Sequence, residues 1–574
     1  MIEISIVDGY IDEPTCLGVP PYISTYPRYI AGAIIDFDSN ISVNYYTIDQ
    51  IRQSFETLQK LNKSSIVILI AGSTVPGKYL ASYPASPQEI LTIVQSLKRP
   101  ITFLCGPAAR FGFSVGGGKK TYDLDTIQSY FNGIITGDPE IVISDFLKHD
   151  MDIDKLRTDL KRNNGHAISS FATKGAVIVK QHPYYPTYLT AEIETYRGCS
   201  RGKTGGCSFC TEPFKGTPDF RFISDIHEEI KALYSSGIRH FRIGSQPCLF
   251  SFMAKNIHSL EFPQPNPDAI EELFSKISII AQDLQTLHID NVNPGIIAHY
   301  PEESKEIIQT IIKYHTSGDV AALGVESVDP EVIRQNNLKA NKEDVIQAIQ
   351  IFNEYGKKQG SNGMPELLPG LNFVCGLKGE TKKTYKLNLS FLHQIMNDNL
   401  LIRRINIRQV IAFPGTLMES IGTHIIRKHQ REFKHFKYKV KMEIEKPILQ
   451  KLIPEGTTLT NVYSEIYKGK ITFGRQLGSY PILVGIPGLY PLHANYNIII
   501  VDHGYRSVTG IPNPLNINTC PRQTLEAIPG IGKKRAIRIL RNRPFHSLKE
   551  FQKVLDDLSI IPYIHPIIQF DNYS

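Results

Sequence analysis

The chain has 574 residues, of which 41 % are hydrophobic and 21 % charged, and its formal net charge at pH 7 is +7. This length predicts three to five domains, and the composition is that of a globular protein with large cores. The longest apolar stretches, such as IVILIAG and YNIIIVD, have the length of strands and are too short for a membrane span. The N-terminus, MIEISIVDGYIDEP, has no apolar signal sequence, so we expect a cytoplasmic protein. In that compartment clustered thiols bind metal more often than they form disulfides.

Residues 1–150 alternate between strand-like and helix-like segments. IEISIVDGY, SSIVILIAG and ITFLCGPAA predict strands, and YPRYIAGAIIDF and PQEILTIVQSLKR predict helices. This alternation predicts an open parallel sheet, as in Rossmann-like domains. Residues 151–185 follow as a mixed, partly basic connector.

Residues 186–420 form a second βα series with six candidate strands, and its first strand leads into a cysteine-rich loop. The loop, YRGCSRGKTGGCSFC, contains Cys199, Cys207 and Cys210. Three thiolates predict an iron–sulfur cluster with one iron left open, part of a structural zinc site, or part of a disulfide framework. Zinc needs a fourth ligand, and the nearest downstream histidine, His227, lies in the predicted helix SDIHEEIKALYSSG.

The same region resembles the radical S-adenosylmethionine (SAM) superfamily, whose signature is a Cys-x3-Cys-x2-Cys loop after the first strand of a partial (βα)6 barrel. The first gap here is seven residues long, whereas the CSFC ending matches the family pattern. FRIGSQ, ALGVESVDPEVIRQNNLKA, LNFVCGLKGETKKTY and INIRQVIAFPGT resemble the family's second, fourth, fifth and sixth strands. The fifth-strand motif includes Gly376, Gly379 and Glu380. The resemblance implies a partial (βα)6 barrel over residues 186–420.

The resemblance also implies the cofactors. Cys199, Cys207 and Cys210 would bind a [4Fe–4S] cluster, and the open iron would bind SAM. The reduced cluster would cleave SAM to methionine and a 5′-deoxyadenosyl radical, with ferredoxin or flavodoxin as the electron donor.

Barrel sites lie at the carboxyl ends of the strands, and this rule gives the candidate contacts to SAM or substrate. The family's Gly-Gly-Glu motif is reduced here to Gly244, followed by Ser245 and Gln246. A structural hydrogen bond is the alternative role for each candidate. The full set is Phe209, Gly244, Ser245, Gln246, Asp290, Asn291, Asn293, Glu326, Ser327, Arg408 and Gln409.

The segment VDGYIDEPTCLGVPPYISTYPRYIAGAI resembles the start of a cobalamin-binding-like domain. The Asp-x-His-x-x-Gly signature is absent, so either cobalamin binds without a histidine ligand or the domain has lost it. Methylthiotransferases have three cysteines for a second cluster in a domain at this position, whereas only Cys16 and Cys105 are present here. Buried free cysteines are the alternative for both, and Cys248, Cys375 and Cys520 have no partner spacing.

Residues 421–512 begin with a basic segment and continue with short strands. Between Arg427 and Lys451 there are nine Lys or Arg residues and three Glu residues, interleaved with Phe and Tyr. LGSYPILVGIPG and YNIIIVDHGYRSVTGI then predict a small β-barrel. Its placement resembles the RNA-binding β-domain of tRNA methylthiotransferases. The alternative for the basic segment is a solvated helix face.

Residues 513–574 are predicted to be helical. Two amphipathic segments flank Pro529-Gly530-Ile531-Gly532 and resemble a helix-hairpin-helix motif, which grips nucleic-acid backbone. Between Arg522 and Lys553 there are nine Lys or Arg residues and two Glu residues. A protein–protein hairpin is the alternative. The candidate phosphate contacts are Gly530, Gly532, Lys533, Lys534 and Arg535.

The whole arrangement resembles an archaeal-type group of radical SAM proteins with a C-terminal helix-hairpin-helix. We therefore expect a [4Fe–4S]/SAM enzyme that methylates or methylthiolates a nucleic acid, with tRNA as the first candidate. One alternative is a radical SAM enzyme acting on a protein or a small molecule. The other is a zinc-stabilised nucleic-acid-binding protein without catalysis. The oligomeric state stays open.

Overall fold

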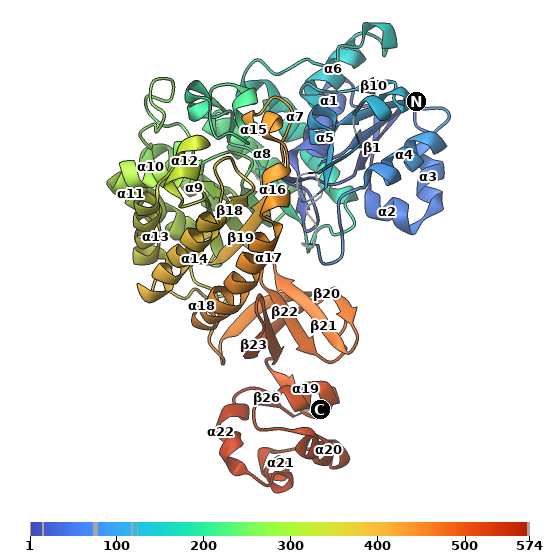
Figure 1. Ribbon diagram of the computed structural model, residues 1–574. Coiled ribbons are helices and arrows are strands. Elements are labelled where there is room, and N and C mark those ends of the chain that lie inside the picture. Colours follow the sequence, from blue (N-terminus) through green and yellow to red (C-terminus); the bar gives the residue numbers. More distant parts are fainter. Residues whose placement is uncertain (1, 14–15, 73–78, 116–118, 123, 571–574) are drawn as a thin grey trace.

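The computed structural model describes residues 2–13, 16–72, 79–115, 119–122 and 124–570. An N-terminal sheet domain lies beside a partial barrel, a small β-barrel lies below them, and the C-terminal helices extend from its far side (Figure 1). Over the described residues, we find no helix with the length and apolar character needed to cross a membrane.

The N-terminal domain is built on a parallel five-stranded sheet in the order β10-β7-β6-β1-β5. Its central strands are buried because helices cover both faces, which confirms the predicted open α/β sheet. The strands are β1 (Glu3–Asp8), β5 (Ser42–Thr47), β6 (Ile66–Ile70), β7 (Ile101–Cys105) and β10 (Gly133–Ile134). The helices include α1 (Thr25–Phe37), α2 (Ile48–Gln53), α3 (Phe55–Leu61), α4 (Pro87–Ser96), α5 (Pro107–Phe111) and α6 (Pro139–Lys148).

The expected connector is folded onto this domain. Its α7 (Ser169–Lys174) and the 3-10 helix Gly175–Gln181 pack against α1. The contact is close, because a Cβ at Gly32 of α1 would lie 1.8 Å from the Phe171 carbonyl oxygen. Glycine is therefore required at this crossing.

Six parallel strand positions form the partial barrel, as predicted. The third position is interrupted at Asp290, so that β15 pairs with β14 while β16 pairs with β17. The short strand β4 (Tyr22–Ile23) adds to the outer edge of β11, which joins the N-terminal domain to the barrel. The strands are β11 (Thr190–Ile193), β14 (His240–Ile243), β15 (Thr286–Ile289) with β16 (Asn291–Val292), β17 (Asp319–Glu326), β18 (Leu367–Cys375) and β19 (Arg404–Gln409).

Helices cover the outside of the partial barrel. Their N-terminal residues follow the helix-start pattern, with proline at the first turn of several and a capping box at Asn341 and at Thr381. They include α8 (Ile223–Ser235), α9 (Pro267–Ile280), α10 (Pro294–His299), α11 (Pro301–Tyr314), α12 (Pro330–Gln335), α13 (Lys342–Gly356) and α14 (Lys382–Asn397).

The basic segment forms a helical run that packs on the last strands of this barrel. It comprises α16 (His424–Lys428), α17 (Gln430–Lys439), a π-helical stretch (Val440–Glu445) and α18 (Lys446–Leu452). Phe436, Val440, Ile444 and Ile448 recur every fourth residue and are buried, whereas most of the Lys and Arg side chains are exposed. The expected boundary at residue 420 therefore falls before the last helix that packs on the barrel, and the basic residues form its solvated face.

A closed five-stranded barrel follows in the order β20-β21-β22-β24-β23, which confirms the predicted small β-barrel. The loop between β21 and β22 reaches into the partial barrel, where the Ser479 amide donates to His288 Nδ1 at 2.8 Å. The strands are β20 (Thr458–Lys468), β21 (Ile471–Gln476), β22 (Leu483–Pro487), β23 (Asn495–His503) and β24 (Ser507–Pro512).

The C-terminal region has a core of its own, which includes Leu525, Ile531 and Phe551. Gly530, at φ +84°, makes the tight turn between the first two helices. The helices are α19 (Arg522–Ala527), α20 (Lys533–Arg541), α21 (Leu548–Val554) and α22 (Ile561–Ile564).

Candidate functional site

The three cysteines of the glycine-rich loop line one cavity. Cys199, Cys207 and Cys210 follow β11 and the two-residue strand Tyr196–Arg197, and the cavity lies between the partial barrel and the N-terminal domain with a volume of about 1170 Å³. Burial, and then the neighbouring Cys207 thiol, raises the pKa of Cys199 to about 11. Burial also raises the pKa of Cys210. Because the thiols of Cys199 and Cys210 resist ionisation here, a bound metal centre is what would keep these two as thiolates.

The long gap between Cys199 and Cys207 is a 3-10 turn (Ser200–Thr204) followed by two glycines. The Arg201 guanidinium is buried in this turn, 3.1 Å from Cys207 Sγ and 2.7 Å from Glu261 Oε1. Ser208 donates to Asn336 Oδ1 at 2.7 Å, which ties the loop to the end of α12. The loop is thus held in place by the barrel. The extra residues between Cys199 and Cys207 form the turn, and all three cysteines still line the cavity.

This donor set fits an iron–sulfur cluster better than the zinc site considered from the sequence. Soft thiolates from one loop, facing a cavity, suit a cluster that keeps one iron open. His227, the nearest histidine downstream of the loop, lies on α8 as predicted, with its Nε2 3.1 Å from the Leu273 carbonyl oxygen. Across residues that the structure describes, no three His, Cys, Asp or Glu side chains gather as ligands of one ion.

Several of the expected SAM or substrate contacts line the same cavity. Phe209 belongs to the cysteine loop, and the others lie in or directly after β16, β17 and β19, at the carboxyl end of the barrel, as the barrel rule predicts. These residues are Phe209, Asn291, Asn293, Glu326, Arg408 and Gln409.

Other candidates have structural partners and do not line the cavity. Gln246 is fully buried, donates to the Ile243 carbonyl at 2.9 Å and accepts from Thr195 Oγ1 at 3.2 Å. Ser327 Oγ donates to Asn388 Oδ1 at 3.3 Å. The alternative of a structural hydrogen bond therefore describes these side chains. The candidates outside the cavity lining are Gly244, Ser245, Gln246, Asp290 and Ser327.

Glu326 has the most unusual backbone among the cavity residues. It sits at a bulge at the end of β17 with φ +62°, a left-handed conformation that is strained for glutamate. Burial raises the pKa of its carboxyl group, although Lys339 and Arg408 oppose the shift. The bulge turns the side chain into the cavity, where it faces two cations.

Lys339 is a cavity residue that the sequence did not single out. Its ammonium group lies 3.9 Å from Glu326 Oε1, and although burial opposes the shift, Glu326 and then Cys207 and Cys210 raise its pKa. Lys339 belongs to the NNLKA segment of the fourth-strand motif, and this position in the motif is the sequence feature from which it could have been chosen as a site residue. Glu326, Lys339 and Arg408 together offer one anion and two cations, which suits a ligand with both an ammonium and a carboxylate group.

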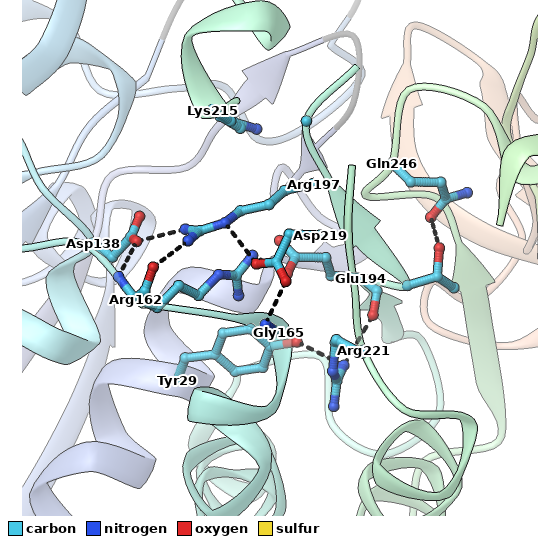
Figure 2. Close-up of polar contacts among 12 residues, drawn as sticks. Tyr29, Asp138, Arg162, Gly165, Glu194, Arg197, Lys215, Asp219, Arg221 and Gln246 are labelled. Atoms are coloured by element: carbon cyan, nitrogen blue, oxygen red, sulfur yellow. Dashed lines mark hydrogen bonds and ion pairs between the residues drawn. The ribbon is translucent and has the colours of Figure 1, made fainter. Parts of the chain in front are cut away.

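The wall of the cavity nearest the N-terminal domain is an ion-pair network. Figure 2 shows Arg197 between Asp138, at the start of α6, and Asp219, at 2.5 and 3.5 Å. The Arg162 amide also donates to Asp138 at 2.8 Å. Despite burial, the guanidinium groups of Arg197, Arg162 and Arg110 hold the pKa of Asp138 well below its usual range. The network clamps the N-terminal domain onto the barrel beside the cysteine loop.

The remaining cysteines do not form a second cluster in the described part of the chain. Cys105 is buried in β7, outside the cavity lining, and burial raises the pKa of its thiol. The side chain of Cys16 lies outside the described part of the structure. Cys248 lines the cavity and accepts from the Asn293 amide at 3.2 Å. Cys375 and Cys520 are buried elsewhere.

The nucleic-acid candidates of the C-terminal helices divide into two groups. Gly532, Lys533 and Lys534 are exposed at the start of α20. Arg535 instead pairs with Asp556 at 2.6 Å and donates to the Gly530 carbonyl at 2.5 Å. Arg535 therefore stabilises the turn, whereas the side chains of Lys533 and Lys534 stay exposed.

Comparison with known proteins identifies relatives of this chain. Residues 193–387 match the family model described as the Radical SAM superfamily. An uncharacterized protein of Archaeoglobus fulgidus is 42 % identical over 557 residues, which cover 96 % of this chain and 97 % of that protein. The ribosomal protein uS12 methylthiotransferase RimO of Mannheimia succiniciproducens is 22 % identical over 52 % of this chain and 62 % of RimO. Among solved structures, the radical SAM methyltransferase TsrM from Kitasatospora setae, with cobalamin and a [4Fe-4S] cluster bound, aligns with a TM-score of 0.48 and 13 % identity, covering 73 % of this chain and 77 % of TsrM.

Proposed function

The chain belongs to the radical SAM superfamily, and on this premise we propose that it modifies a nucleic acid, with tRNA as the first candidate, by transferring a methyl or methylthio group. The observation that carries the proposal is the combination of two distant features. A three-cysteine loop faces the large cavity, and an exposed lysine pair lies on the C-terminal helices. The first supplies radical chemistry and the second supplies affinity for phosphates.

The cofactors of the superfamily are a [4Fe–4S] cluster and SAM. We assign the cluster to Cys199, Cys207 and Cys210, because all three line the cavity. When bound, the cluster supplies the electron that cleaves SAM to methionine and a 5′-deoxyadenosyl radical.

The chain's own residues position the cofactor and the substrate. Glu326 would accept from the ammonium group of SAM, while Arg408 and Lys339 would donate to its carboxylate. The clamp around Asp138 closes the cavity on the side of the N-terminal domain and limits the access of water.

The small β-barrel and the C-terminal helices would bind the nucleic acid. Lys533 and Lys534 are the first two residues of α20, whose N-terminal amide groups have no side-chain cap, so a backbone phosphate would meet two positive charges and the helix dipole. Such contacts are independent of base sequence and salt-sensitive. They would hold the substrate while the target base enters the cavity.

Methyl transfer is the form of the reaction that the N-terminal domain favours. The segments that follow the carboxyl ends of β7 and β10 line the large cavity, and this is the edge at which open α/β sheets bind ligands. Arg110, Phe111 and Thr136 line this side of the cavity, and no histidine does so among the described residues. Its volume of about 1170 Å³ exceeds that of a typical small-ligand pocket of about 300–1000 Å³. We therefore place cobalamin here, bound without a histidine ligand.

A protein substrate is the second candidate, and the likeness to RimO favours it. RimO is named as a methylthiotransferase for ribosomal protein uS12, and the matched region covers 52 % of this chain. Under this alternative the C-terminal helices would dock the enzyme onto an RNA-containing particle or another protein.

A label-transfer assay tests the proposal. The anaerobically reconstituted protein is incubated with methyl-labelled SAM, a reductant and either tRNA or ribosomal proteins. We expect label in tRNA, its loss in the Cys207→Ala variant, and its retention in the matched Cys520→Ala control. Label in ribosomal protein alone would replace the nucleic-acid proposal with the second candidate.

A further inference from the structure

We propose that a second, smaller cavity beside the large one binds the phosphate group of the nucleotide that is modified. The inference rests on the proposed function, and it adds where the target nucleotide is held. The smaller cavity has a volume of about 360 Å³ and lies on the open side of the partial barrel, between β4 and β19. The small β-barrel closes it from below through the loop that carries Tyr480.

The two cavities are contiguous. Asn406 and Arg408 of β19, together with Tyr480 and Asp12, line both. Arg404, Asn406 and Arg408 alternate along β19, so their side chains share one face of the strand. A ligand in the smaller cavity is therefore next to the Arg408 end of the larger one, where SAM is expected.

Two arginines of β19, together with a third that directly precedes the strand, give the smaller cavity its positive charge. Arg403, Arg404 and Arg408 line it, and none forms an ion pair with a carboxylate in the described part of the chain. Arg403 is only 9 % exposed, and its Nε, like that of Arg408, has no hydrogen-bond partner there. Arg403 Nη2 donates to the Tyr480 carbonyl at 3.0 Å, and the Arg404 guanidinium stacks on the Tyr480 ring at 3.5 Å.

This arrangement contrasts with the buried arginines elsewhere in the barrel. Arg28 pairs with Glu229 and Arg242 with Glu192, each at 2.5 Å, as burial of a charge requires. Burial, together with the neighbouring Arg404, lowers the pKa of Arg403 to about 9. A buried guanidinium group with no carboxylate partner in the protein would be stabilised by a bound anion.

Each acidic residue discussed near the smaller cavity already has an ion-pair or hydrogen-bond partner in the protein. Glu445 pairs with Arg506 at 2.5 Å, and Arg475 pairs outside the cavity lining with Glu465 at 2.6 Å. Asp12 accepts from the Tyr79 hydroxyl at 3.0 Å. The Tyr79 hydroxyl is neutral, so Asp12 keeps its own charge, but the lining still has more cations than anions: Arg403, Arg404, Arg408, Arg475 and Arg506 against Asp12 and Glu445. Planar guanidinium groups recognise phosphate in a bidentate manner.

The remaining wall suits the sugar next to that phosphate, with the base directed past Arg408 into the large cavity. Tyr22, Leu449, Ile482 and Tyr505 supply apolar and aromatic surface. A volume of about 360 Å³ admits one nucleotide and excludes a duplex. The target would therefore have to leave its stack to enter, as it does in other base-modifying enzymes.

The test compares nucleotides with nucleosides on the full-length reconstituted protein. Calorimetric titrations use the four 5′-nucleoside monophosphates, the matching nucleosides and inorganic phosphate, at one low salt concentration. We expect at least one monophosphate to bind about tenfold or more tightly than its nucleoside. This difference should disappear in Arg403→Gln/Arg404→Gln and persist in Arg334→Gln, an exposed arginine on α12 that is already paired with Glu331.

Equal binding of nucleotide and nucleoside in the wild type would overturn the proposal, and so would a difference that persists in the double variant. Inorganic phosphate binding as tightly as the monophosphate would reassign the site to free phosphate. If the glutamine variant does not fold, Arg403→Lys/Arg404→Lys is measured instead, because lysine keeps the charge but lacks the planar guanidinium group. In that variant, an unchanged preference for the monophosphate over its nucleoside would contradict the proposal. The label-transfer assay is independent: retained label transfer with failed discrimination removes the phosphate site and leaves the proposed function standing.

Discussion

Glu326 and Lys339 face each other in the large cavity, with the carboxylate oxygen and the ammonium nitrogen 3.9 Å apart. The glutamate comes from a bulge at the end of β17, and the lysine from the segment after α12. Lys339 also lies within electrostatic reach of Cys207 and Cys210. The pair therefore links the SAM side of the cavity to the cysteine loop.

Replacing either member of this pair should weaken SAM binding. We expect Glu326→Gln and Lys339→Gln each to lower the affinity for SAM about tenfold or more, because each removes one charge-assisted contact. Equilibrium binding of SAM to the reconstituted protein measures the effect. The control is Glu331→Gln, on the exposed surface of α12. If the affinity for SAM is unchanged in both cavity variants, the methionyl group of SAM does not bind beside Glu326 and Lys339.

The cysteine loop gives the sharpest prediction on metal content. Cys199→Ala, Cys207→Ala and Cys210→Ala should each lose iron and sulfide and abolish SAM cleavage, since a cluster held by two thiolates from this loop is not retained. Iron, sulfide and zinc analysis after anaerobic purification measures this, with Cys520→Ala, a buried cysteine of the C-terminal core, as the control. One equivalent of zinc without sulfide in the wild type would instead support a non-catalytic protein.

The lysine pair of α20 should govern RNA affinity but not SAM cleavage. Lys533→Ala/Lys534→Ala is expected to weaken tRNA binding uniformly across sequences and to reduce the slope of log K against log salt by about 1.5. Gel-shift titrations at several salt concentrations measure it. The matched control is Lys357→Ala/Lys358→Ala, an exposed lysine pair after α13. A pair whose loss impaired RNA binding and SAM cleavage equally would argue against separate roles for the two regions.

Asp8 predicts a specific dependence of stability on pH. Burial raises its pKa from 3.8 to about 6, although hydrogen bonds from the Tyr10 amide and the Tyr45 hydroxyl, both at 2.9 Å, oppose the shift. The folded state then binds more protons than the unfolded state between these two values, so the contribution of Asp8 to stability falls as pH rises from about 4 to about 6.

Asp8→Asn removes this titration. The unfolding free energy of Asp8→Asn relative to that of the wild type should therefore rise by about 2.4 kcal/mol between pH 4 and pH 7. Calorimetric melting of the full-length protein at a series of pH values measures the difference between the two proteins, in which the other titrations cancel. A difference that is constant with pH would mean that Asp8 keeps its ordinary pKa.

Much of the architecture could be predicted from the sequence because it is encoded locally. Strand-length apolar runs ending in glycine and polar residues marked β1, β6 and β7 of the five-stranded sheet and all six barrel positions, and the closed β-barrel followed from its turn signals. The shorter or more polar β5 and β10 were not predicted. The cysteines were found from their clustering in one loop, and Glu326 from the resemblance of its surroundings to a radical SAM strand motif; the barrel topology brings them to one cavity.

The parts that could not be predicted depend on long-range packing. Gln246 looks like a site residue by position, but its amide is used by Thr195 and Ile243. The basic segment is a barrel helix because its buried residues recur every fourth position, a pattern hidden by the number of charges between them. Arg535 carries the same charge as Lys533, but it forms an ion pair with Asp556, which lies 21 residues further along the chain.

The central claim is that this chain modifies tRNA, and a mass-spectrometric profile of tRNA nucleosides from cells with and without the gene tests it most directly. We predict that one modified nucleoside disappears on deletion and returns with the wild-type gene but not with Cys207→Ala. Its mass will distinguish a methyl from a methylthio group. A profile unchanged by deletion would contradict the claim and direct attention to a protein substrate.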